Sequence, residues 1–189
     1  MSDRSFVRAG GYAGVLLAVT SWAAVVAFYA GLGQQTFQLL YALIAFWALI
    51  GIGAVREVIR PSGQAWSRYA TLVGSIAAVG TIAGSLYDVA RLRAGMDIAA
   101  PNPVNPFNVM TFGLTAIWFL VAATLLMRTR GIPQLLALLG YVAFADLTFG
   151  FIATLLGATQ LATFAAVIAG AVGGPIFWLW LGIVLIRSA

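Results

Sequence analysis

Six apolar runs, each about 20 residues long, dominate the sequence. A run of that length can cross the roughly 30 Å hydrocarbon core of a bilayer as one helix. The sequence therefore predicts an all-α, polytopic membrane protein, a compact bundle of six transmembrane helices that forms a single domain over residues 1–189 with no soluble domain. The expected limits are Ala9 to Ala30, Phe37 to Val55, Tyr69 to Val89, Phe107 to Met127, Pro133 to Leu156 and Leu161 to Ile186.

Prolines and glycines punctuate these runs. Pro106 and Pro133 stand where the fourth and fifth helices are expected to begin, because the first turn of a helix does not need the N–H that proline lacks. The last run is long, and it is interrupted by Gly173, Gly174 and Pro175.

Arginines divide unevenly between the two sides of such a bundle. With six spans both termini lie on one side, which then carries eight arginines, against two on the other. By the positive-inside rule, this asymmetry predicts that both termini are cytoplasmic. The first side has Arg4, Arg8, Arg56, Arg60, Arg68, Arg128, Arg130 and Arg187, and the second has Arg91 and Arg93.

The longest loop, residues 90–106, is then expected on the outer side. Its three prolines, Pro101, Pro103 and Pro106, favour extended backbone, which suits either a lid or docking strap or a simple connector.

The residue types that are present restrict the possible chemistry. All ten basic residues are arginine, and the chain has no lysine, histidine or cysteine. This composition excludes retinal-type Schiff bases, imidazole ligation of haem or metals, thiolate chemistry and the Ser/His and Cys/His catalytic arrangements. We therefore expect no cofactor, no metal site and no autonomous catalysis. Although the net charge is +5, the arginines lie at segment ends, so no nucleic-acid partner is expected.

Three pairs of glycines have the spacing that lets membrane helices approach closely. They are Gly10 and Gly14, Gly80 and Gly84, and Gly170 and Gly174. Small residues four apart allow van der Waals packing where lipid supplies no hydrophobic force between helices. Together the pairs favour a compact bundle in the lipid bilayer, and they leave open a face for another membrane subunit or for a second copy of the chain.

One acid, Asp146, falls in the middle of the fifth run. An ionisable group at this depth costs several kcal/mol unless something compensates. Steps of three and four residues from Asp146 reach Ala143, Gly150 and Ala153, so the acid shares its side of the helix with small residues and is expected to face protein. No arginine lies at its depth, and we therefore expect the carboxyl group to be neutral and protonated.

A neutral carboxyl group still needs hydrogen-bond partners. On the sixth helix the same depth falls near Gly170 and Ala171, and Pro175 cannot donate a hydrogen bond to the carbonyl of Ala171. That carbonyl is the expected partner, and hydroxyl groups on other helices are alternatives. Two interpretations follow, an interhelical polar clamp and a site that carries a proton or binds a ligand. The alternative hydroxyl groups are those of Thr20, Ser21, Thr81 and Thr115.

Three stretches carry a resemblance to a known group of proteins. They are "VRAGGYAGVLLAVTSW" near the start, "RTRGIPQLLALLGYVAFADLTFGFIATLL", and "GPIFWLWLGIVLIR" near the end. The Arg-x-x-x-Pro entry to the fifth helix, the Leu-Gly pair and the Trp-rich last helix resemble the bacterial DUF4386 group of small multi-spanning membrane proteins. The resemblance implies a multi-pass protein of the bacterial inner (cytoplasmic) membrane. It implies no activity and no site residues, because that group has no established function.

Two functions fit these features. The first is a non-catalytic accessory or structural component of a membrane assembly, which the glycine pairs and the missing catalytic residue types favour. The second is a small transporter or proton-coupled carrier with a midplane site at Asp146. An intramembrane enzyme is a weaker third interpretation, because a lone acid can act as a general acid or base but has no nucleophile or metal beside it.

Overall fold

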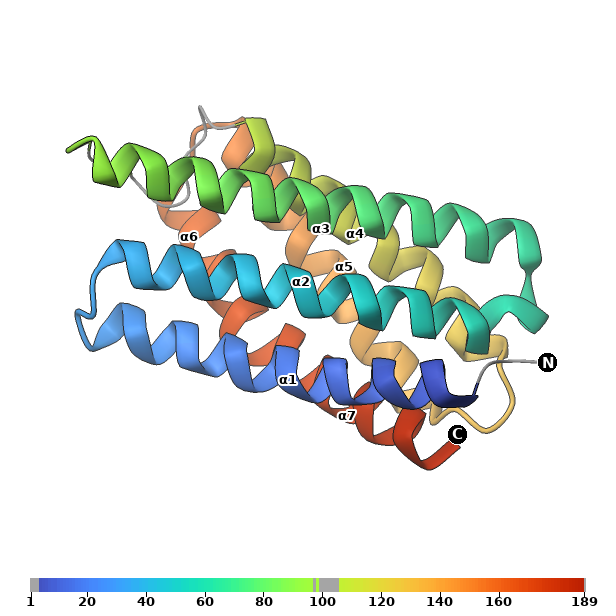
Figure 1. Cartoon of the computed structure of the whole chain (residues 1–189). Helices are drawn as coiled ribbons and strands as arrows, with labels where there is room; N and C mark the ends of the chain where they lie inside the picture. The colour runs from blue at the N-terminus through green and yellow to red at the C-terminus, as the bar shows by residue number, and fades with distance from the viewer. Residues whose placement is uncertain (1–3, 97, 99–105, 189) are drawn as a thin grey trace.

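The chain folds as a bundle of long helices (Figure 1). The computed structural model describes residues 4–96, 98 and 106–188, and these residues contain helices and short connections but no strand. The elements are α1 (Arg4–Tyr29), α2 (Gln34–Ile59), the short 3-10 helix η1 (Arg60–Ser62), α3 (Gln64–Arg93), α4 (Pro106–Arg128), α5 (Gln134–Leu155), α6 (Thr159–Ile168), the π-helical segment η2 (Ala169–Gly173) and α7 (Gly174–Ser188).

Within the described residues, six helices are long and apolar enough to cross a membrane, with α6, η2 and α7 together forming the sixth. This confirms the predicted all-α fold and the predicted number of membrane-length helices. Helices α1, α2 and α3 begin before the predicted runs, and α2 and α3 also extend beyond their predicted ends. Glycines in a left-handed conformation lie in several of the turns: Gly131 (φ 83°) and Gly157 (φ 69°), for example, lie on either side of α5.

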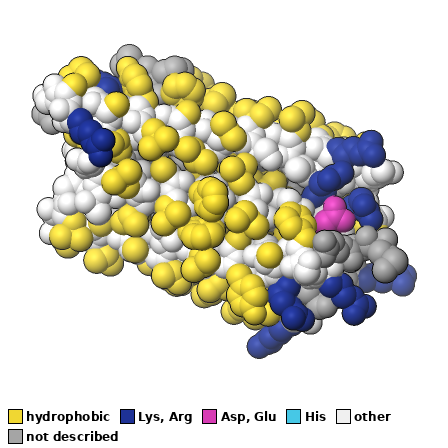
Figure 2. All heavy atoms as spheres, in the orientation of Figure 1, with side chains coloured by type: hydrophobic (Ala, Val, Ile, Leu, Met, Phe, Trp, Pro, Cys, Tyr) yellow, Lys and Arg dark blue, Asp and Glu magenta, His cyan; other side chains and the backbone are white. Residues whose placement is uncertain are grey.

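Consecutive membrane-length helices are antiparallel neighbours. The last of them packs against the first through α7 and α1, which closes the bundle into a ring. Both termini lie at the same end, which we call the terminal end; the turns between α1 and α2 and between α5 and α6 lie at the opposite, distal end (Figure 1). In the face that Figure 2 shows, arginine side chains gather at the two ends and apolar side chains cover the length between them. This distribution is typical of membrane-spanning bundles.

The loop between α3 and α4 is described only in part. Helix α3 continues to Arg93, four residues beyond the predicted limit of Val89. The segment with Pro101 and Pro103 lies outside the described residues, so its interpretation as a lid, strap or connector stays a prediction.

Four aromatic side chains form the centre of the core, and we call them the aromatic cluster: Trp118 and Phe119 from α4, and Phe177 and Trp178 from α7. The two indoles stack with centroids 5.2 Å apart and an interplanar angle of 7°. Glycines on neighbouring helices make room for the rings. A Cβ at Gly51 of α2, for example, would lie 2.6 Å from the Trp178 ring. The cluster therefore depends on glycine at positions that a hydropathy profile does not distinguish.

Apolar and polar residues are distributed differently along the core. In the terminal half, large apolar side chains from α2, α4, α5 and α7 are almost completely buried: Val55, Ile59, Leu125, Leu126, Leu136, Leu181 and Leu185. Apart from Ser67, the buried polar side chains of the described residues lie toward the distal end: Thr20, Ser21, Gln38, Ser85, Asp88 and Thr154. The core of the terminal half is thus mainly apolar, and most of the buried polar side chains belong to the distal half.

The three glycine pairs have different environments. A Cβ at Gly10 would clash with Ala54 of α2, one at Gly14 would lie 2.9 Å from the Trp178 carbonyl oxygen of α7, and one at Gly80 would lie 2.5 Å from Met110 of α4. Gly84 is buried. Gly170 differs, because a Cβ there would meet nothing within 4 Å, and Gly174 approaches only the carbonyl of Ala169 in its own helix. The first two pairs therefore pack inside the chain, whereas a Cβ at either glycine of the third pair would meet no other helix among the described residues.

Candidate intramembrane site around Asp146

Asp146 lies at the edge of the buried face of α5 and is itself half-buried. On one side of it are the buried residues Ala143 and Gly150, and on the other are Val142 and Phe149, which are exposed. Its Oδ2 atom is buried and has no hydrogen-bond partner among the described residues. The acid is therefore positioned in the protein without the contacts that a buried carboxyl group ordinarily makes.

Two close contacts fix the register between α5 and the sixth helix. A Cβ at Gly150 would lie 3.1 Å from the Cβ of Ala165, and one at Gly140 would lie 3.4 Å from the Phe177 ring. Because the two helices run antiparallel, Asp146 is level with the residues between these contacts, at Ala169 to Ala171. The sequence indicates the same depth for Gly170 and Ala171.

At this level the sixth helix is not α-helical. Ala169–Gly173 form the π-helical segment η2, and the N–H of Gly174 donates to the carbonyl of Ala169, five residues earlier. Pro175 follows directly and has no N–H, so it cannot continue the α-helical ladder. Single π-helical turns occur mostly inside α-helices, frequently at functional sites. Here the wide turn lies at the depth of the acid, and a Cβ at Gly170 would meet nothing within 4 Å.

The carbonyl that was expected to accept from Asp146 has a different donor. Trp22 of α1 donates its Nε1–H to the Ala171 carbonyl over 3.0 Å. The sequence argument correctly indicates that this carbonyl needs a donor beyond its own helix, because Pro175 supplies none. It names the wrong donor, since an indole on α1 reaches the carbonyl and the Asp146 Oδ2 is left unpaired.

The alternative hydroxyl partners are also used elsewhere. Thr20 donates to the Leu16 carbonyl over 2.7 Å, and Thr81 donates to the Ala77 carbonyl over 2.9 Å. Ser21 likewise donates to the carbonyl of Leu17. These bonds return the hydroxyl groups to their own helices, which is the common arrangement for Ser and Thr inside helices, and the Thr81 hydroxyl also lies 3.2 Å from that of Thr111 on α4. Thr115 lies on α4. The Asp146 Oδ2 has no hydrogen bond to any of these hydroxyl groups.

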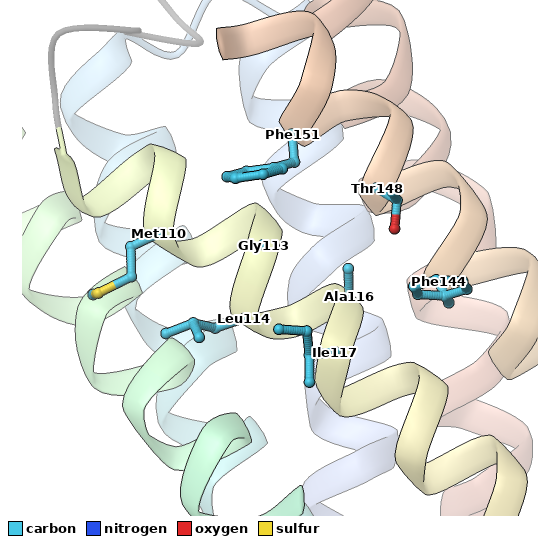
Figure 3. A pocket seen from close by; sticks show the side chains of 8 residues that line it. All are labelled: Met110, Gly113, Leu114, Ala116, Ile117, Phe144, Thr148 and Phe151. Atoms are coloured by element: carbon cyan, nitrogen blue, oxygen red, sulfur yellow. The ribbon is translucent and has the colours of Figure 1, made fainter.

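A groove of about 430 Å³ runs between α4 and α5 on the opposite side of α5 from Asp146 (Figure 3). On α5 it is lined by Phe144, Thr148 and Phe151, which repeat at helical spacing. Figure 3 shows the Phe151 ring above the groove and Phe144 at its side. The α4 wall consists of Met110, Gly113, Leu114, Ala116 and Ile117. The groove can accommodate hydrocarbon but offers no charged group, so it is a separate feature from the acid.

A second acid, Asp88, lies near the distal end of α3, and its place in the sequence one turn before Arg91 predicts an exposed pair. That prediction is wrong about exposure, because Asp88 is only 2% accessible. Gly84 and Ser85, one turn earlier, are buried on the same face. The signal that could have identified Asp88 is this run of small residues beside it.

No protein-family model, curated protein or solved structure matches the chain. The resemblance to the DUF4386 group therefore stays a prediction.

Proposed function

We propose that the chain is a small proton-coupled carrier of the bacterial cytoplasmic membrane, with both termini in the cytoplasm and with Asp146 as the group that takes up and releases the proton. One observation carries the proposal. Asp146 has a buried oxygen without a hydrogen-bond partner among the described residues, and it lies level with a π-helical break in the neighbouring helix. Ionisable residues inside membrane spans are rare and usually mark ion pathways or proton relays.

The clamp interpretation fits this geometry less well. A clamp stabilises the bundle by pairing the carboxyl group with the facing helix, but the carbonyl available for that role accepts from Trp22. Leaving a buried polar atom unpaired costs about 1–3 kcal/mol. A site that must bind and release a proton tolerates such a cost, whereas a purely structural contact gains nothing from it.

The broken sixth helix supplies the second element that a carrier needs. In many transporters the binding site lies near the midplane, where a helix is interrupted and its backbone departs from α-helical geometry. In this chain, η2 joins α6, which packs on α5, to α7, which packs on α1. A change in η2 would move α6 relative to α7 beside the acid, and this movement would couple protonation to the access of cargo.

Proton flux into liposomes tests the proposal. Purified protein is reconstituted with a trapped pH-sensitive dye, and the wild type is compared with Asp146→Asn, which keeps the volume but cannot ionise. Thr148→Val is the matched control, because Thr148 lies two residues away in the α4–α5 groove. We expect flux in the wild type and in Thr148→Val but not in Asp146→Asn. A wild type without flux above protein-free liposomes, or an Asn variant with undiminished flux, would refute the proposal.

A second function is favoured by a different observation. Gly170 and Gly174 are the pair at which an added Cβ would meet no other helix among the described residues, so this position can receive a helix of another subunit. The protein would then be an accessory or structural component of a membrane assembly. Purification in mild detergent distinguishes the two functions. Another membrane protein that co-purifies stoichiometrically, and is lost in Gly170→Leu, supports the assembly function, whereas an isolated monomer or homodimer supports the carrier.

A further inference from the structure

The hydrogen bond from the Trp22 Nε1–H to the Ala171 carbonyl joins α1 to the neighbouring segment η2. A carbonyl that accepts from a side chain on another helix tilts away from the axis of its own helix. A widened π-helical turn provides this tilt, and Pro175 removes the N–H that would otherwise draw the carbonyl back into an α-helical turn. The indole thus occupies the position at which the backbone of the sixth helix lacks a donor.

The two halves of the sixth helix are anchored on different neighbours. Gly182 of α7 packs on α1 so closely that a Cβ there would lie 2.6 Å from the Gly11 carbonyl oxygen. On the other half, Ala165 of α6 packs on Gly150 of α5. Each residue of an α-helix advances the helix by about 100°. If the π turn became α-helical, its extra residue would therefore rotate α6 relative to α7, which is held by α1. The face that α6 presents to α5 near Asp146 would change.

We infer that Trp22 is a positioning residue, which holds η2 in its π-helical register and thereby sets the face that the sixth helix presents at the depth of Asp146. The consequence for proton binding rests on the proposed carrier function. The consequence for the packing of α6 does not, so the two can be tested separately.

The surroundings of Asp146 make it a sensitive reporter of this register. The elements packed against α5 are α4, α6, η2 and α7. Their charged side chains are Arg128 and Arg187, both in the last turns of their helices at the terminal end. On α5 itself, Tyr141 is paired with Thr124 over 3.0 Å. Since none of these described elements places a charged side chain at the depth of the acid, the packing of the sixth helix beside it would determine how readily the carboxyl group ionises.

The structural test uses disulfide formation, for which the cysteine-free chain is well suited. Gly150→Cys with Ala165→Cys reports the present register, and Gly150→Cys with Ala166→Cys is the matched control pair. We expect Trp22→Phe, which keeps a ring but removes the donor, to lower cross-linking of the first pair relative to the second by about threefold. That change corresponds to the ~0.6 kcal/mol average of a hydrogen bond between membrane helices. Trp66→Phe replaces an exposed indole at the terminal end, and it should change the cross-linking of neither pair.

Pro175→Ala provides an independent variant in case Trp22→Phe fails to fold. It restores the N–H at residue 175, so the sixth helix can satisfy the Ala171 carbonyl itself. The same change in cross-linking is expected although Trp22 is intact. If both variants fold and both keep the wild-type cross-linking ratio, the inference is overturned.

The functional test is the pH profile of proton flux. In Trp22→Phe the midpoint should differ from that of the wild type, because the face that α6 presents beside Asp146 changes, while Trp66→Phe keeps the wild-type midpoint. If the cross-linking ratio changes but the wild type carries no protons, the positioning role stands and the proposed function fails. If the wild type carries protons but Trp22→Phe alters neither readout, the function stands and the inference fails.

Discussion

The unpaired oxygen of Asp146 has a consequence for stability. Replacing the acid by leucine removes a buried polar atom without a partner among the described residues, which costs about 1–3 kcal/mol, and the half-buried position of residue 146 can accommodate a leucine side chain. We expect Asp146→Leu to unfold at a higher temperature than the wild type in detergent, by an amount that corresponds to about 1 kcal/mol. Asp146→Asn, which stays polar, should melt near the wild type. A lower melting temperature for the leucine variant would instead support the clamp.

At the residue scale, the sequence predicts those properties of a residue that depend on the residues next to it along the chain. The depth of Asp146 and the donor missing at Ala171 both follow from counting residues along apolar runs and from the chemistry of Pro175. The identity of the donor does not follow, because Trp22 is 149 residues away along the chain. Which indole reaches the carbonyl is decided by the packing of α1 against the sixth helix, and the residues around the carbonyl do not encode that choice.

At the scale of elements, Gly14 and Gly170 each belong to a pair of glycines four residues apart, but replacing each of them by alanine should change the stability in opposite directions. Gly14→Ala places a Cβ 2.9 Å from the backbone oxygen of Trp178, so α1 and α7 must separate, and we expect a loss of about 1–3 kcal/mol. Gly170→Ala meets nothing within 4 Å and removes a flexible residue from a helix, which favours stability by up to ~1 kcal/mol. Detergent melting of the two variants measures the difference. Equal losses would contradict the packing described for α1 and α7.

The sixth helix shows how far an element can be predicted. Gly173, Gly174 and Pro175 indicate an interruption, and the structure has η2 directly before the proline. The sequence does not specify the kind of interruption, because a kink, a break and a π-helical turn all satisfy the geometry that proline imposes. A donor on another helix, here Trp22, is among the interactions that distinguish them.

For the whole molecule, the number of spans is predictable because the length of an apolar run is set by the thickness of the bilayer. The closure of the ring by α7 on α1 is not predictable from hydropathy, since lipid-facing and protein-facing surfaces are equally apolar. Glycines such as Gly11, Gly14 and Gly182 determine that contact, and their spacing indicates close packing without naming the partner helix.

The orientation of the bundle is the last prediction. Eight arginines belong to the side of the termini and two to the other, so the terminal end should face the cytoplasm. Gln134, the first residue of α5, and Gln160, near the start of α6, provide a matched pair, because both are exposed and they lie at opposite ends of the bundle. In this cysteine-free chain, Gln160→Cys should react with a membrane-impermeant maleimide on intact spheroplasts, whereas Gln134→Cys should react only after permeabilisation. The opposite labelling pattern would place the termini outside, and labelling of both variants on intact spheroplasts would show that the chain inserts in both orientations.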